Sequence, residues 1–220
     1  MHAQPHPTGL RRARKGSIVL LVSPSGAGKT TLSVAVRKRL AATGGEFAKV
    51  VTHTTREPRT GEQEGVHYHF VSTEQFRTLE AAGAFVETAF VHGRPYGTSK
   101  AAISKILDAG RDAMLVIDVQ GAAAIKAQFP DAIYVFILPP SVSALRERLK
   151  MRGQDDELEI ARRLAESTNE IRRWKEADYV LVNDDLATAT EELFAIVSSH
   201  HLKSRKEDHA ELVAILLARY

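Results

Sequence analysis

Cysteine is absent from this chain of 220 residues, and aromatic residues make up only 6% of it. Without thiols the protein has no disulfide framework and no thiolate metal site, which fits a reducing interior. Long hydrophobic runs are lacking too. The longest apolar stretches, such as Ile18–Val22 and Val213–Ala218, fall far short of the roughly 18 residues that a membrane helix needs. We therefore expect a folded protein with an ordinary core and no membrane partner.

Acidic residues are missing from residues 1–16, which contain four of the 30 basic residues. The rest of the chain carries 26 basic residues against 27 acidic ones, so its body has no excess positive charge. This balance predicts that nucleic acid is not a partner. Residues 1–16 also lack the apolar segment of a secretory signal. We interpret them as a disordered basic leader, with a targeting or tag remnant as the alternative.

Short apolar runs alternate with helical patterns from residue 17 onward, which is typical of a parallel sheet flanked by helices. The sequence predicts an α/β fold with five strands, at residues 17–22, 49–52, 113–118, 133–138 and 178–183. Helices are expected at residues 29–42, 119–128, 141–152, 156–174 and 185–201. Residues 53–97 break this rhythm and predict a small mixed insertion. Residues 204–220 form a C-terminal helical extension that packs on its own domain or on a second subunit of a homo-oligomer.

The first predicted strand runs into a P-loop pattern, in which serine replaces the usual first glycine. Backbone N–H groups and the start of the next helix would hold phosphates there. The lysine would reach the outer phosphates, and the hydroxyl of Thr30 could bind Mg²⁺. The alternative is a glycine-rich turn with a chance lysine. The residues concerned are Ser23, Pro24, Ser25, Gly26, Ala27, Gly28, Lys29, Thr30 and Thr31.

Three further residues predict a second anion site. Arg56 and Arg59 stand three residues apart in the insertion, and Tyr68 follows on an expected strand. Two guanidinium groups and a phenol suit a phosphate monoester, because arginine binds phosphate bidentately. A solvated basic turn is the alternative. Asp118 ends the strand at 113–118, where open α/β sheets bind their ligands.

Nine stretches of residues 17–203 resemble the guanylate kinases in the expected order. They are SPSGAGKTT, THTTREPRTGE, HYHFV, AFVETAFVHGRPYGTS, VIDVQGA, FILPPS, RERLKMRGQ, ARRLA and VNDDL. The resemblance implies a cytoplasmic P-loop kinase that moves the γ-phosphoryl group of ATP to GMP, with Mg²⁺ as cofactor. It also implies a core at residues 17–52 and 98–203, a GMP-binding insertion at 53–97 and a helical lid at 140–170.

The resemblance assigns roles by position. The GMP phosphate is expected to bind Thr52, Arg56, Arg59, Tyr68 and Tyr96, and the guanine base Glu87 and Thr98, with Asp118 nearby. Lys29 and the lid arginines Arg148, Arg152 and Arg163 would stabilise the transferred group, and Asn183 would lie near the ATP base. Mg²⁺ would be held by Thr30, and by Asp118 through water. Where the family commonly has an acidic residue two positions before Asp118, this chain has Val116.

The expected lid helix at 141–152 should begin at a Ser141 cap and end at Gly153. Its apolar stripe would be Val142, Leu145 and Leu149. At 100° per residue, Arg148 and Arg152 lie beside that stripe and toward the cleft, whereas Arg146 and Lys150 form a solvated face.

Two other functions share the same core: a peptide-binding scaffold and a kinase acting on a phosphorylated sugar. A scaffold is expected to have lost the P-loop lysine or the arginines, and this chain keeps Lys29 and Arg56. A sugar phosphate has no base to recognise, so Glu87 and Thr98 favour a nucleotide. His67 and His69 have no carboxylate at metal-ligand spacing, and we expect no histidine metal site.

Overall fold

The computed structural model describes residues 16–43, 47–59, 61–91, 93–151, 156–204, 214, 217 and 218. Its core is a parallel five-stranded sheet, as the sequence predicted, and the strand order is β2-β7-β1-β8-β9. The strands are β1 (Ile18–Val22), β2 (Phe47–Lys49), β7 (Asp112–Ile117), β8 (Ile133–Leu138) and β9 (Tyr179–Val182). All five residues of β1 are buried, because helices cover both faces of the sheet.

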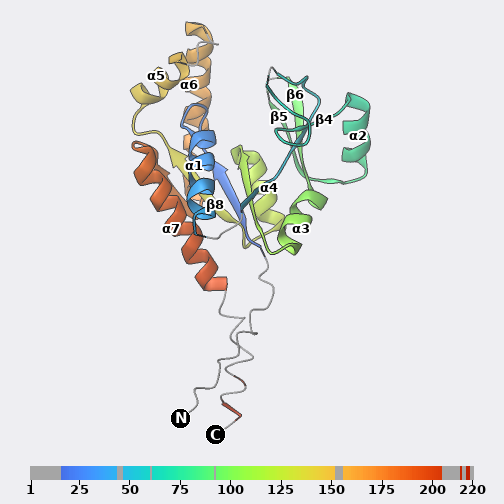
Figure 1. Cartoon of the computed structure of the whole chain (residues 1–220). Helices are drawn as coiled ribbons and strands as arrows, with labels where there is room; N and C mark the ends of the chain where they lie inside the picture. The colour runs from blue at the N-terminus through green and yellow to red at the C-terminus, as the bar shows by residue number, and fades with distance from the viewer. Residues whose placement is uncertain are drawn as a thin grey trace.

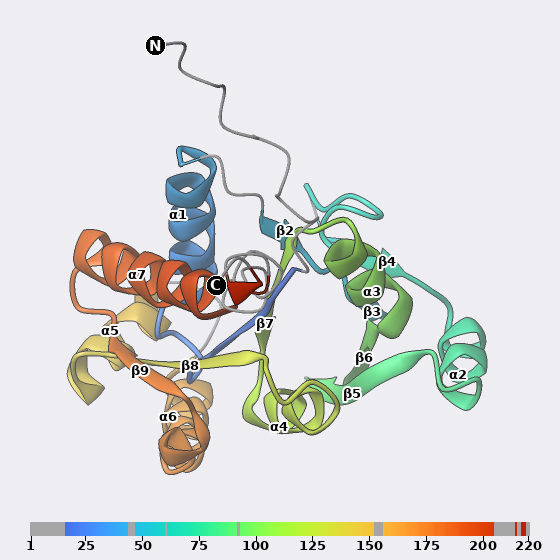
Figure 2. The same ribbon diagram turned by 90° about the horizontal axis from the view of Figure 1, so that it is seen from below.

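Two helices cover each face of this sheet (Figure 2). On one face lie α1 (Lys29–Ala41) and α7 (Leu186–Ser204), whose side chains at helical spacing, such as Leu32, Val36 and Leu193, are fully buried. On the other lie α3 (Lys100–Asp108) and α4 (Val119–Gln128). Parallel strands place their carboxyl ends at one edge, so the loops after β1 and β7 meet there.

A second sheet stands beside the core (Figure 1). It has the order β4-β3-β6-β5, built from β3 (His53–Thr54), β4 (His69–Phe70), β5 (Phe85–Val91) and β6 (Arg94–Ser99). β3 pairs parallel with β4 and antiparallel with β6, so this sheet has both kinds of pairing. Helix α2 (Thr73–Ala81) follows a capping box between Ser72 and Gln75.

The lid region contains α5 (Val142–Met151) and α6 (Glu157–Ile171). Leu145, Leu149 and Ile160 are buried together and form a small core between the two helices. The Ser141 hydroxyl oxygen accepts a hydrogen bond from the Ala144 N–H at 3.0 Å, so the predicted cap is confirmed. Gly153, the predicted end of this helix, lies outside the described residues.

Several expected elements differ from the structure. The second core strand is β2 at 47–49 instead of 49–52. The Val50 N–H still donates to the Met114 carbonyl of β7 at 3.4 Å, and the chain then turns toward the second sheet, where the Thr52 carbonyl accepts from the His69 N–H. Tyr68 precedes β4 and makes only an isolated bridge with Glu64. Val142 is 70% exposed and is no part of the apolar stripe. The expected helix at 156–174 ends at Ile171, and a 3₁₀ turn covers Trp174–Glu176.

Helix α3 was not expected from the sequence. Its N-cap is Ser99, which ends β6 and accepts a hydrogen bond from the Ala102 N–H. Among the described residues, no helix is long and apolar enough to span a membrane. The predicted leader, apart from Gly16, and most of residues 204–220 lie outside the described part of the chain.

Candidate active site

The loop between β1 and α1 has the geometry of a phosphate cradle. Gly26 and Gly28 have φ angles of +90° and +93°, a region that side chains other than glycine rarely adopt. Gly28 is the N-cap of α1 and makes no side-chain cap, so the first N–H groups of the helix face the loop opening. The positive end of the helix dipole adds to their pull on an anion.

Ser23 fits the position where the motif usually has glycine. It is 1% exposed, and its hydroxyl donates to the carbonyl of Pro24 at 2.8 Å. Its own carbonyl accepts a hydrogen bond from Lys29 Nζ, so the lysine spans the loop from the first turn of α1. The backbone of Ser23 therefore supplies a contact that holds the Lys29 side chain across the loop.

Asn183, at the end of β9, joins the cradle to the lid. Its Nδ2 donates to the Ala27 carbonyl at 2.7 Å, and its own carbonyl accepts from Arg148 Nη2 at 2.9 Å. The side chain is so close that a Cβ placed on Gly28 would lie 2.3 Å from Nδ2. The expected site near the ATP base is thus also a buried brace of the P-loop.

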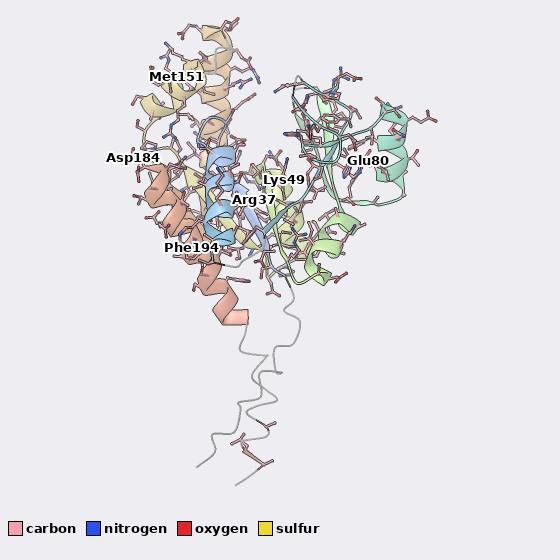
Figure 3. All side chains as sticks on the ribbon, viewed as in Figure 1. Arg37, Lys49, Glu80, Met151, Asp184 and Phe194 are labelled. Atoms are coloured by element: carbon pink, nitrogen blue, oxygen red, sulfur yellow. The ribbon has the colours of Figure 1, made fainter. Side chains whose placement is uncertain are left out.

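A cavity of about 290 Å³ opens beside this brace. Figure 3 labels two of its lining residues, Met151 and Asp184, which come from α5 and from the end of β9. The cavity lies between the P-loop and α5, where the adenosine part of ATP is expected. Its lining residues are Gly26, Gly28, Thr31, Arg148, Met151, Asn183, Asp184 and Leu186.

The lid arginines differ in their contacts. Arg148 Nη1 is buried and has no hydrogen-bond partner within the described part of the chain, so this atom is available for an anion. Arg163 Nε lies 3.1 Å from Glu159 Oε1. Arg152 lies outside the described residues. Arg146 and Lys150 pair with the exposed carboxylate of Glu157, which places them on the solvated face, as the sequence indicated.

Arg56 is the centre of the predicted phosphate receptor. Its Nη2 donates to both carboxylate oxygens of Glu62, at 2.8 and 2.9 Å, and its Nε donates to the Tyr96 hydroxyl at 3.3 Å. The Tyr68 ring lies 5.4 Å from the Arg56 Cζ and 5.7 Å from the Tyr96 ring. The guanidinium group is thereby held in place before any phosphate arrives.

Glu62 is a residue to which sequence reasoning gave no role. Its Oε2 accepts the Arg59 N–H at 2.7 Å, a hydrogen bond that lowers the pKa of Glu62, and Arg56 lowers it further. The signal was its spacing, since it follows Arg59 by three residues and can close the turn. The Arg59 residue itself is exposed, and Thr52 lies half-buried between β2 and β3.

The expected base-reading residues come together at the edge of β5, β6 and α4. Thr98 Oγ1 donates to Glu87 Oε1, and a Cβ built on Gly121 would lie 3.1 Å from Glu87 Oε2. Burial raises the pKa of Glu87, the hydrogen bond from Thr98 opposes this, and the charge of Asp118 adds to it. The carboxylate is therefore half-buried, and within the described part of the chain the Thr98 hydroxyl is its hydrogen-bond donor.

Asp118 is the N-cap of α4, and its Oδ1 accepts from the Gly121 N–H at 2.8 Å. Thr30 is the second residue of α1, which follows β1, and β1 is the neighbour of β7 in the sheet. The Thr30 hydroxyl and the Asp118 carboxylate therefore lie at the same edge of the sheet. Oxygen donors of this kind are those that Mg²⁺ prefers. Among the described residues no three histidine, aspartate or glutamate side chains could hold a metal together.

Glu170 on α6 was also missed. Burial raises its pKa, whereas Lys29 and the Ser25 N–H act in the opposite direction, so this carboxyl group faces the P-loop. It stands seven residues after Arg163, on the same face of the helix. That spacing was the signal available in the sequence.

Comparison with known proteins assigns the family. A family model described as guanylate kinase matches residues 15–200. The chain belongs to the guanylate kinase family. It is 45% identical over 193 residues to a guanylate kinase of Nitrosococcus oceani, which covers 88% of this chain and 93% of the relative. A guanylate kinase of Methylobacillus flagellatus is 47% identical over 194 residues, or 88% of this chain and 94% of the relative.

A solved structure supports the same family assignment. The guanylate kinase of Anaplasma phagocytophilum superposes with a TM-score of 0.67 and 31% identity, over 86% of this chain and 87% of that one. Family membership agrees with the predicted fold, a P-loop kinase core with a parallel sheet flanked by helices.

Proposed function

We propose that this protein transfers the γ-phosphoryl group of ATP to GMP, giving ADP and GDP. One observation carries the proposal: the half-buried Glu87 and its partner Thr98 lie on β5 and β6, and Tyr96, which accepts a hydrogen bond from Arg56, lies on β6 of the same small sheet. The first pair would bind a base, and the second would bind a phosphate. A nucleoside monophosphate is the substrate that needs both.

Guanine fits the carboxylate better than adenine does. Its N1–H and N2–H are donors on one edge, and a carboxylate accepts both, whereas adenine presents an acceptor at N1. A site that hydrogen-bonds a substrate group can reject analogues that lack it by about 10⁴–10⁵-fold. The groups assigned to GMP address its phosphate and base, so we extend the proposal to dGMP.

The phosphate receptor combines charge with hydroxyl donors. Arg56 and Arg59 would bind the phosphate of GMP, and Thr52 and Tyr96 would add hydroxyls. Burial raises the pKa of Tyr68, so its phenol remains a donor at neutral pH. The acceptor oxygen belongs to a phosphate that is ionised near neutral pH, so the reaction needs no strong general base.

On the donor side, the P-loop N–H groups and Lys29 would hold the phosphates of ATP, and Asn183 would border its base. Arg148, with its buried and unpartnered Nη1, would bind the transferred group together with Arg163 and Arg152. Positive charge of this kind is worth about 10³–10⁵ in rate. Thr30, and Asp118 through water, would hold Mg²⁺, which neutralises charge on the phosphates when bound.

We further propose that residues 53–97 and the lid at 140–170 move toward the core when GMP and ATP bind. Closure would exclude water, which would otherwise accept the phosphoryl group in place of GMP. Both substrates are small molecules of the cytoplasm, and we place the activity there.

A coupled assay of ADP release, run with Mg²⁺ and ATP across GMP, dGMP, AMP, CMP and UMP, tests the proposal. GMP should be preferred over AMP by several orders of magnitude. Lys29→Ala should lower kcat by about 10²–10³-fold while the melting temperature stays close to that of the wild type. Equal rates with GMP and AMP would refute the guanine assignment, and an unimpaired Lys29→Ala would refute the P-loop assignment.

A further inference from the structure

The side chain of Lys49 links the core sheet to a turn of the insertion. It is the last residue of β2, the edge strand of the core sheet, and the chain passes from β2 to β3 through residues 50–52. Its Nζ donates to the His67 carbonyl at 2.9 Å and lies 3.4 Å from the Val66 carbonyl. Figure 3 shows Lys49 between the core helix α1 and the second sheet.

The turn that Lys49 holds carries a residue of the phosphate receptor. Tyr68 follows directly after the two carbonyls, and Lys49 Nζ lies 5.6 Å from the centre of its ring. Arg56 and Tyr96 contact the same ring from within the second sheet. The position of Tyr68 is thus fixed by one group from the core and by two from the insertion.

The setting of this ammonium group is unusual for a lysine near the surface. Burial lowers the pKa of Lys49, the neighbouring Arg37 lowers it further, and only Glu62 opposes the shift. Its hydrogen-bond partners among the described residues are two carbonyls, and its third contact is an aromatic face. A partly desolvated cation that makes these contacts holds the turn in place, and salt bridging contributes little to that role.

We propose that Lys49 is a positioning residue of the GMP phosphate receptor. By tying the turn at 66–67 to β2, it sets the place of the Tyr68 hydroxyl relative to Arg56 and to the core that carries the P-loop. This inference rests on the proposed function, because it assumes that the Tyr68 site receives the acceptor phosphate. Lys49 acts through Tyr68 and touches neither substrate.

Lys49→Met removes the hydrogen bonds and keeps most of the stem, and Lys49→Arg restores a donor of similar reach. Lys38→Met, an exposed lysine on α1, is the matched control for loss of one charge. We expect KM for GMP to rise about 3- to 10-fold in Lys49→Met, the size of one net hydrogen bond. KM for ATP should change less than about twofold, and Lys49→Arg and Lys38→Met should resemble the wild type.

The dependence of KM for GMP on salt concentration distinguishes a positioning role of Lys49 from simple attraction between charges. A lost hydrogen bond keeps the Lys49→Met effect on KM constant between about 50 and 300 mM KCl, whereas attraction over a distance fades across that range. An unchanged KM for GMP in Lys49→Met, an equal rise for ATP, or an effect that vanishes in salt would each overturn the inference. If Lys49→Met fails to fold, Lys49→Gln replaces it with the same expected split. Absence of GMP phosphorylation in the wild type would instead refute the proposed function.

Discussion

Thr98 Oγ1 donates a hydrogen bond to Glu87 Oε1, and the two residues are paired across β5 and β6. This hydrogen bond stabilises the ionised form of a carboxyl group whose pKa is otherwise raised by burial and by Asp118. The pair therefore keeps a charge in place where a guanine edge would need one. It also makes recognition of that base dependent on the protonation of one residue.

Acidification should weaken GMP recognition before ordinary glutamates titrate. Because the pKa of Glu87 lies above the usual 4.5, this residue takes up its proton first as the pH falls, and kcat/KM for GMP falls with it. The GMP phosphate itself titrates near pH ~6. The measurement is therefore kcat/KM for the wild type divided by kcat/KM for Glu87→Gln across pH. The titration of the GMP phosphate affects both enzymes and cancels in this ratio.

Thr98→Val should move that acid limb to higher pH, since it deletes the hydrogen bond that favours the ionised carboxylate. The ratio of kcat/KM for Thr98→Val to that for Glu87→Gln shows the shift. A limb that stays in place, or that moves to lower pH, would contradict the geometry of the pair.

Glu62→Gln should raise KM for GMP about 3- to 10-fold, because Arg56 loses a charged, bidentate partner that holds it in the receptor. The KM for ATP should not change. Glu57→Gln, an exposed change in the same turn, is the control and should leave both constants intact. A fall in KM would show instead that Glu62 competes with the phosphate for Arg56.

Arg148→Lys should lower kcat by about 10²-fold or more and leave KM for GMP nearly unchanged. Lysine keeps the charge but has a single nitrogen, so it cannot hold the Asn183 carbonyl and also place a donor where Arg148 Nη1 lies. Arg146→Lys, on the exposed face of α5, is the matched control. Equal loss in the two variants, measured by steady-state ADP release, would argue against a special place for Arg148.

Gly28→Ala should destabilise the protein by about 1–3 kcal/mol, because the φ of +93° strains any side chain and the new Cβ would collide with Asn183. Gly83→Ala has a φ of +64° and open space around it, so it should cost only about 1 kcal/mol. Denaturant midpoints of the two variants give the comparison. The reverse order would mean that Asn183 moves aside freely.

The core could be predicted from the sequence because its strands are buried on both faces and read as apolar runs, as in Ile18–Val22 and Ile133–Leu138. The P-loop was predictable for a local reason, since its glycines, lysine and threonine are consecutive. β2 was misplaced because Val50 and Val51 continue the apolar run, although the strand pairing with β7 ends at Lys49 and is followed by one further hydrogen bond, from the Val50 N–H to the Met114 carbonyl. Helix α3 has only two buried apolar residues, Ile103 and Leu107, which is too few for a periodic signal.

The remaining features depend on contacts between distant segments. Nothing near Lys49 in the sequence shows that its side chain reaches a turn 18 residues later. Likewise, Glu170 acquires its place beside Lys29 only when α6 packs over the P-loop. The binding and catalytic roles assigned to individual site residues, Thr52, Arg59 and Arg152 among them, stay predictions.

Asn183 connects the P-loop to helix α5 through a single residue. Its side-chain amide, at the end of the edge strand β9, donates to the glycine-rich loop, and its backbone carbonyl accepts from the guanidinium of Arg148 on α5. Loss of these two hydrogen bonds would shift α5 and the P-loop together. A substitution of Asn183 is therefore expected to change nucleotide affinity and turnover together.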